Sequence, residues 1–181
     1  MEKKGGYQNL IVYQQAVLIF DLNAKFCKEF LDPIGDRRTA EQMEQAGRSG
    51  KQNIVEASLE KSLKSNIKLS GVARGSYGEL LEDYKDYLRV RKLPIWPKDD
   101  PRTLTIRRMR IGSNESNLTN LSNWTNSPER FANLMITLIS KEDYLLDRLV
   151  ASLENKFISE GGYSENLTKQ RINFKNSNWT N

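Results

Sequence analysis

Residues 10–31 read LIVYQQAVLIFDLNAKFCKEFL, and the spacing of their apolar side chains is that of a long α-helix. The apolar positions step by three and four residues, which places one stripe of them against other helices. Pro33 and Gly35 follow and end the helix. Cys27 lies on the stripe, where a small buried hydrophobic side chain is expected rather than a reactive thiol. The predicted stripe consists of Leu10, Tyr13, Val17, Phe20, Ala24, Cys27 and Leu31.

The same period predicts a second and a third helix. The second is expected to begin near Asp36 or Thr39, because residues 39–42 match a capping box. The third is expected over residues 65–92. Glycine in a helix costs about 1 kcal/mol relative to alanine, so three glycines on one side of the third helix predict close approach by the small inner face of the second. The glycines are Gly71, Gly75 and Gly78, and the inner face consists of Met43, Ala46, Gly50, Ile54 and Ala57.

A break separates the third helix from the last one. Pro94 and Pro97 cannot continue a helix, because each lacks an N–H and restricts the residue before it. Asp100 followed by proline reads as an N-cap with proline at the first helical position, so a short helix is expected over residues 101–111. Residues 113–126 are polar, rich in asparagine and without period, and they are expected to form a mobile loop.

The last long helix has the clearest start. Ser127 fits the N-cap position, Pro128 the first helical position, and Glu129 adds an acidic side chain to the first turn. Glycines at 161 and 162 end the helix, and a short basic tail follows. The predicted core stripe of this helix is Leu134, Leu138, Leu145, Leu149 and Leu153.

These elements predict an all-α fold, an antiparallel up-down four-helix bundle with an inserted segment before the last helix. Short connections between the first three helices favour antiparallel neighbours. Residues 1–92 would hold helices one to three of the bundle. Residues 93–126 would form the insertion with its short basic helix and Asn-rich loop, and residues 127–181 the last bundle helix and the basic tail.

Composition argues against catalysis. The 181 residues include one cysteine and no histidine, which removes the commonest general base, the commonest metal ligand and every cysteine-based zinc site. We therefore expect no enzymatic activity, no cofactor and no metal. An acidic cluster on the third helix could suggest a di-metal centre, but such centres use Glu-x-x-His pairs, so a solvated face is expected. The cluster comprises Glu79, Glu82, Asp83 and Asp86.

Two further observations concern location. The chain has no stretch of about 20 apolar residues, so no membrane span is expected. Residues 1–7 lack the apolar segment of a secretory signal. A cytoplasmic location is the resulting expectation.

Charge permits an anionic partner. The net charge is +5, from 28 basic and 23 acidic residues, which suits contact with RNA or DNA. Arginines crowd the short inserted helix, and residues 101–111 carry no acidic side chain, so this helix is the best candidate for phosphate contacts. A solvated or partner-facing helix surface is the alternative interpretation. The candidate nucleic-acid-binding residues are Arg107, Arg108 and Arg110, followed by Arg48, Lys51 and Arg74.

Several motifs resemble those of a bacterial family. Residues 45–56, QAGRSGKQNIVE, and residues 73–80, ARGSYGEL, are similar to motifs of the four-helix-bundle proteins first noticed in intervening sequences of 23S ribosomal RNA genes. The accessory variability determinant of diversity-generating retroelements is a relative within that family. The opening YQNLIVYQQA at 7–16 resembles the family as well. The stretches LPIWPKDDPR at 93–102 and EGGY at 160–163 resemble a longer subgroup with a C-terminal suffix region.

The resemblance implies an up-down bundle, a ring-like homopentamer and, in the retroelement branch, basic surfaces that bind RNA and a reverse transcriptase. Apolar residues outside the predicted stripes agree with an oligomer, because a monomer would leave them exposed. We therefore expect a non-enzymatic homo-oligomer that binds structured RNA as an accessory factor to a reverse transcriptase. The alternative is a protein–protein adaptor that docks a partner enzyme without binding nucleic acid. Examples of apolar residues outside the stripes are Ile11, Ile19, Phe26 and Leu81.

Overall fold

The computed structural model describes residues 6–109 and 121–178. Within these ranges every regular element is helical and no strand occurs, so the predicted all-α class is confirmed. The elements are η1 (Gly6–Asn9), α1 (Ile11–Phe30), α2 (Arg37–Leu59), α3 (Leu63–Val90), α4 (Pro101–Arg108), η2 (Ser122–Trp124), α6 (Pro128–Glu160) and α7 (Tyr163–Asn178).

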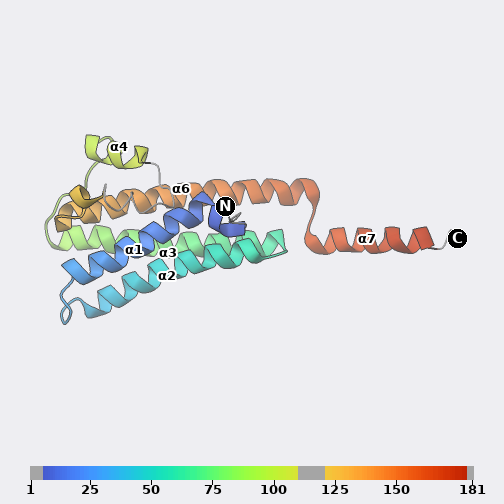
Figure 1. Cartoon of the computed structure of the whole chain (residues 1–181), viewed down its shortest axis with the longest axis horizontal. Helices are drawn as coiled ribbons and strands as arrows, with labels where there is room; N and C mark the ends of the chain where they lie inside the picture. The colour runs from blue at the N-terminus through green and yellow to red at the C-terminus, as the bar shows by residue number, and fades with distance from the viewer. Residues whose placement is uncertain (1–5, 110–120, 179–181) are drawn as a thin grey trace, which may run out of the picture.

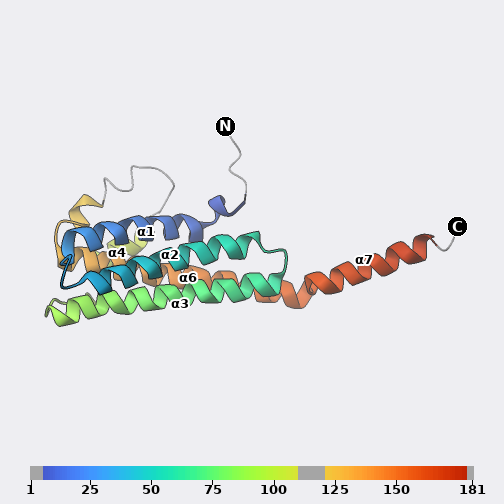
Figure 2. The same cartoon turned by 90° about the horizontal axis from the view of Figure 1, so that it is seen from below.

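Four long helices, α1, α2, α3 and α6, lie side by side along the long dimension of the molecule (Figures 1 and 2). α1 packs against α2 and α6, and α3 packs against the same two helices. α4 lies outside these four helices, against α6 (Figure 1). α7 begins where α6 ends and points away from the other helices in both views.

Side-chain caps set the starts of two of these helices. Ser62 caps α3 and Ser127 caps α6, because each Oγ accepts a hydrogen bond from the backbone N–H three residues later, at 3.5 and 3.3 Å. α2 begins at Arg37, so the predicted start near Asp36 is confirmed and the alternative start at the capping box of residues 39–42 is wrong. The N-cap residue of α2, Asp36, makes no capping hydrogen bond, and its carboxylate pairs with Arg91 at 2.7 Å instead.

Aromatic rings form the centre of the core. Phe26 of α1 is fully buried and meets Tyr84, Tyr87 and Phe131 edge-on, with ring centroids 4.9, 4.9 and 5.4 Å away. Such pairs contribute about 0.5–1.5 kcal/mol each beyond the burial of their surface. One phenylalanine thus ties α1 to both α3 and α6.

The buried stripe of α1 differs from the predicted one. Cys27 is buried as expected, but Ala24 is exposed and the predicted positions before it are only partly buried. Two polar side chains point inward instead: Gln15 Nε2 donates to a backbone carbonyl of α6 at 2.8 Å, and Asn23 Nδ2 donates to one of α2 at 2.9 Å. The buried residues of α1 are Val12, Gln15, Ala16, Ile19, Leu22, Asn23, Phe26 and Cys27.

The observed stripe of α1 also removes most of the apolar surface that was expected to favour an oligomer. Ile19 and Phe26, which were expected on an outer surface, are 0% exposed and belong to the core of one chain. Leu81 packs against that core. Ile11 alone of the four is largely exposed, at 61%.

The glycines of α3 do not approach α2, contrary to the prediction. Gly71, Gly75 and Gly78 are exposed, and a Cβ added to any of them would meet no atom within 4 Å. The close approach comes from α2, where a Cβ at Gly50 would lie 2.6 Å from the ring of Tyr77. Gly50 therefore makes room for a buried ring, and the predicted inner face of α2 is buried throughout.

Part of the expected loop is packed against the long helices. α4 ends at residue 108, earlier than the predicted 111, and residues 110–120 lie outside the described residues. From residue 121 the chain is described again, with Leu121 and Thr125 buried. Thr125 Oγ1 accepts a hydrogen bond from Lys25 Nζ at 3.4 Å. The mobile-loop prediction is therefore wrong for this last part of the segment.

Candidate nucleic-acid interface

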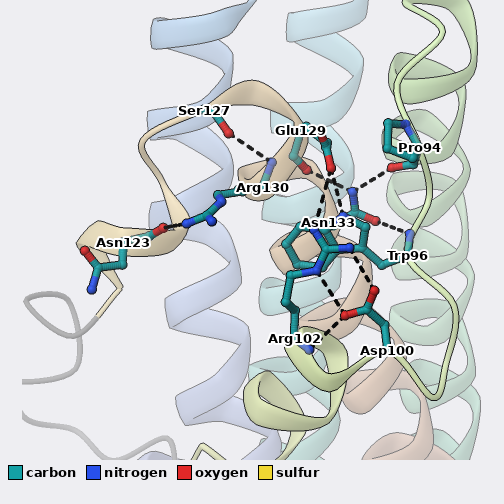
Figure 3. A network of polar contacts seen from close by, with 9 residues as sticks. All are labelled: Pro94, Trp96, Asp100, Arg102, Asn123, Ser127, Glu129, Arg130 and Asn133. Atoms are coloured by element: carbon teal, nitrogen blue, oxygen red, sulfur yellow. Dashed lines mark hydrogen bonds and ion pairs between the residues drawn. The ribbon is translucent and has the colours of Figure 1, made fainter.

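One buried amide fixes the segment between α3 and α4 to α6. Asn133 is 2% exposed; its Oδ1 accepts from Trp96 N at 2.8 Å, and its Nδ2 donates to the carbonyl oxygens of Pro94 and Glu129, both at 2.9 Å (Figure 3). Pro94 and Pro97 prevent this segment from forming a helix of its own. The Asn133 side chain supplies the partners that a helix would have supplied.

Trp96 supports the start of α4. Its Nε1 donates to Glu129 Oε1 at 2.9 Å, and the Arg102 guanidinium carbon lies 3.9 Å from its ring centroid (Figure 3). Arg102 also donates to both oxygens of the Asp100 carboxylate, at 3.0 and 2.8 Å, and this pairing is the main cause that lowers the pKa of Asp100. Asp100 caps the helix by accepting from the Arg102 backbone N–H at 2.8 Å. The charge of Arg102 is thus balanced within this network.

Lys141 of α6 holds the other end of α4. Its Nζ donates to the backbone carbonyl of Met109 at 2.9 Å and to that of Arg107 at 3.4 Å. A cation at this end stabilises the negative end of the helix dipole. Burial lowers the pKa of Lys141, and the neighbouring Glu142 opposes that shift. α4 is therefore tied to α6 at both ends.

The outer side of α4 carries the first predicted group of arginines. Thr103 and Ile106 form the buried face of the helix, at 4% and 0% exposure. Arg107 and Arg108 are exposed, and neither forms an ion pair with another described residue. Arg110 lies outside the described residues. A helix in a fixed position therefore presents two guanidinium groups to the surroundings.

The second predicted group, on α2, lies on a different side of the molecule. Arg48 is exposed beside a hollow between α1 and α2 that Glu41 and Glu44 also line. Lys51 Nζ lies 3.6 Å from the Phe20 ring centroid, in a cation–π contact. α4 packs on the outer side of α6, whereas α2 packs against α1 and α3 at the opposite edge of the group of long helices (Figure 1). The structure therefore does not combine the two groups into one surface.

Arg74 connects two helices within the chain. It donates to Asp143 at 2.9 Å and to Asp147 at 2.7 Å, across the contact between α3 and α6. The hydrogen bond to Asp143 is the main cause that raises the pKa of Arg74. Two carboxylates thus offset its charge, which makes Arg74 the least suitable of the five described candidates for a phosphate contact.

Sequence reasoning missed helix α7. The tail predicted after Gly161 forms a helix of 16 residues, about 24 Å long at a rise of 1.5 Å per residue. Gly161 ends α6 with a φ of 79°, and Glu165 Oε2 accepts from Gly162 N at 3.0 Å. This acidic residue in the first turn was the available signal for a new helix. The exposed basic residues of α7 are Lys169, Arg171 and Lys175, and its exposed large apolar residues are Tyr163, Leu167, Ile172 and Phe174.

The described ranges contain no group of three or more His, Cys, Asp or Glu residues that could hold a metal ion. Within the acidic cluster of α3, Glu82 pairs with Lys85 and Asp86 pairs with Arg89, at 2.6 and 2.9 Å. Burial raises the pKa of the Cys27 thiol to about 12, so it stays protonated at neutral pH. These groups show neither metal-site geometry nor a reactive thiol.

The chain matches no protein-family model, no curated protein and no solved structure. Among the described helices, none is long and apolar enough to cross a membrane. The family resemblance and the partners that it implies therefore stay predictions.

Proposed function

We propose that this protein is a non-enzymatic, homo-oligomeric helical bundle that binds structured RNA. The supporting observation is the pair Arg107 and Arg108, two exposed guanidinium groups without an ion-pair partner among the described residues, on a helix held at both ends. Groups on a fixed helix lose less conformational freedom on binding phosphate than groups on a mobile segment. Each phosphate that they neutralise releases condensed counterions, which favours binding at low salt.

We further propose that the four long helices form an antiparallel up-down bundle. Residues 31–36 join α1 to α2 and residues 60–62 join α2 to α3, and connections this short favour antiparallel neighbours. The contacts also close a ring, in which α6 packs against both α3 and α1. In such a bundle residues 93–126 are the inserted segment before the last helix, and α4 belongs to this segment.

An oligomer would repeat the basic groups and convert weak single contacts into avidity. The exposed glycine face of α3 supports this idea, because a helix without side chains at Gly71, Gly75 and Gly78 lets another backbone come close. The resemblance to the 23S intervening-sequence family implies a pentamer. Light scattering after size exclusion should then give about five times the chain mass of 20.9 kDa. A single-chain mass at micromolar protein would contradict the oligomer.

RNA binding is tested with fluorescence anisotropy on a structured RNA. We expect R107A/R108A to reduce the slope of log affinity against log salt by roughly 1.4–1.8, since each phosphate contact contributes about 0.7–0.9. The matched control is R37A/R89A, which removes two exposed arginines that already pair with Glu41 and Asp86. An equal reduction of this slope in the two variants would show a general effect of net charge. Absence of binding by the wild type at about 50 mM salt would contradict the proposal.

A protein–protein adaptor is the second candidate. α7 exposes Tyr163, Leu167 and Phe174 at 42%, 46% and 69%, which suits a partner with an apolar surface. A reverse transcriptase or another enzyme would be the docked protein. A wild type that binds no RNA, together with enzyme binding that is lost on removal of α7, would favour the adaptor.

A further inference from the structure

Three polar side chains lie at one level in the apolar interior of the four long helices. Gln15 of α1, Tyr77 of α3 and Glu142 of α6 are all 0% exposed. Gln15 Nε2 donates to the carbonyl of Leu138 at 2.8 Å, which places its amide one helical turn from Glu142. Tyr77 is near enough that the Glu142 charge, after burial as the main cause, raises the pKa of the Tyr77 hydroxyl. We refer to these three residues as the internal polar cluster.

The oxygen atoms of the internal polar cluster lack partners. Gln15 Oε1, Tyr77 Oη and both carboxyl oxygens of Glu142 are buried, and none has a hydrogen-bond partner among the described residues. An ionised Glu142 can only accept, so the donors for these oxygen atoms would be the Tyr77 hydroxyl and the second N–H of Gln15 Nε2, whose first N–H donates to Leu138 O. A protonated Glu142 adds a third donor. Buried polar groups are otherwise almost always satisfied, so the cluster needs both a proton and further donors.

Packing seals the cluster from solvent. α2 places Gly50 against the Tyr77 ring, where an added Cβ would lie 2.6 Å from it. About one helical turn away from Gln15, Gly50, Tyr77 and Glu142, in both directions, the residues are apolar and buried. In one direction these are Val12, Ile54, Ala73 and Leu146, and in the other Ile19, Ala46, Leu80 and Leu138.

Among the described residues, no charged group hydrogen-bonds to the Glu142 carboxyl, and the groups of α1, α2 and α3 in the cluster are uncharged. α1 contributes the amide of Gln15, α2 contributes Gly50, and α3 contributes the neutral phenol of Tyr77. The phenol stays neutral because burial raises its pKa well above the ordinary value. Ionisation of Glu142 would therefore place an anion among neutral groups.

The two cations closest to the cluster along the chain, Arg74 and Lys141, bind other groups. Arg74, on the adjacent turn of α3, pairs with Asp143 and Asp147 on the outer side of α6. Lys141 precedes Glu142 in the chain, but its Nζ donates to backbone carbonyls at the end of α4. Neither cation hydrogen-bonds to the Glu142 carboxyl, whose oxygens have no partner in the described part of the chain.

We propose that Gln15, Tyr77 and Glu142 form an internal site that binds a proton on Glu142 and ordered water between the three side chains. An ionised carboxylate is far harder to transfer into apolar surroundings than the neutral acid, so the folded chain keeps the proton. Each water brings two donors, and buried waters occupy sites that offer two to four polar partners. The donors of a bound water would thus compensate for the excess of acceptors in the internal polar cluster.

The site makes the folded state sensitive to pH. Burial raises the pKa of Glu142 well above its ordinary value, and Lys141 opposes this less strongly. Above about pH 4.5 the unfolded chain loses a proton that the folded chain retains, so the unfolded state binds fewer protons and the folded state loses stability as pH rises. From this group alone, the folding equilibrium constant should fall about tenfold per pH unit until the folded pKa is reached.

Urea unfolding of wild type and E142Q across pH 5–8 tests the proton. Glutamine keeps the shape of the neutral acid, so we expect E142Q to lack the tenfold loss per pH unit and to exceed the wild type in stability at the upper end. The matched control is E154Q on the same helix, where the residue is exposed and the wild-type pH dependence should persist. The same pH dependence in wild type and E142Q would overturn the proton assignment.

Two measurements on the wild type decide the question even where E142Q fails to fold. In a carboxyl carbon-13 NMR titration, Glu142 should titrate well above its ordinary pKa, and titration near that ordinary value would overturn the proposal. In a high-resolution crystal structure, a water should lie within hydrogen-bond distance of at least two of the three side chains. Direct contacts among the side chains, or a bound cation in their midst, would overturn the water assignment.

Discussion

Helices α4 and α7 both lie outside the four long helices, and they are held in opposite ways. α4 has 8 residues and is fixed by Asp100 at its start, Lys141 at its end and a buried face against α6. α7 has 16 residues, yet it shows no buried side chain among those described and projects from the end of α6 (Figure 1). The position of a helix thus depends on the side chains that it buries against other helices. The length of the helix contributes little to fixing its position.

The difference bears on how each helix would present charge. The segment that leads into α4 is fixed by two hydrogen bonds of Trp96, a buried one from its backbone N–H to Asn133 and a partly buried one from its Nε1 to Glu129. The basic residues of α7 stand on a helix with exposed surfaces all round. On the proposed function, α4 provides fixed phosphate contacts, and α7 extends the reach of the molecule at a larger loss of freedom on binding.

The largest expected effect is on the anchoring of α4. N133A leaves the Trp96 N–H and the Pro94 carbonyl without partners in a buried site, so we expect a loss of about 3 kcal/mol in unfolding free energy. The matched control is N166A, which removes one exposed hydrogen bond, from Asn166 Nδ2 to Glu160 O at 3.1 Å. That variant should lose less than about 0.5 kcal/mol. Urea unfolding followed by tryptophan fluorescence measures both, and similar losses would contradict the contrast between the helices.

Local signals in the sequence predicted much of the fold. A serine followed by proline marked the start of α6 at Ser127, and small residues from Met43 to Ala57 marked the inner face of α2. The stripe of α1 was missed because apolar residues surround that helix, so more than one stripe fits the period. Which stripe of α1 faces the core depends on Gln15 and Asn23, whose side chains point inward and donate hydrogen bonds to backbone carbonyls of other helices.

The candidate site was predicted less completely than the fold. Arg107 and Arg108 are exposed on the helix that the arginine pattern indicated. The pattern could not show that Arg74 meets Asp143 and Asp147, because these partners lie 69 and 73 residues away in the chain. The pattern also could not show which side of α3 faces inward. The period of a helix shows which residues share a face, but it does not show what that face contacts.

A smaller effect should distinguish the basic residues of α4 from those of α7 in RNA binding. We expect K169A/R171A/K175A on α7 to weaken binding by about threefold, and R107A/R108A on α4 to weaken it by about tenfold, because fixed groups lose less freedom on contact. Anisotropy titrations at one salt concentration compare the two variants directly, and circular dichroism confirms that both remain helical. A larger loss from the α7 variant would reverse the comparison and identify α7 as the main contact.

The smallest expected effect concerns the apolar side chains of α7. Leu167 and Phe174 are 46% and 69% exposed, so truncating both removes little buried surface from a single chain. L167A/F174A should therefore change the unfolding free energy by less than about 0.5 kcal/mol. N133A serves as the positive control in the same urea assay. A loss above about 1 kcal/mol would mean that α7 packs against something in solution. If that loss grew with protein concentration, the partner would be another copy of the chain, because stability then depends on association.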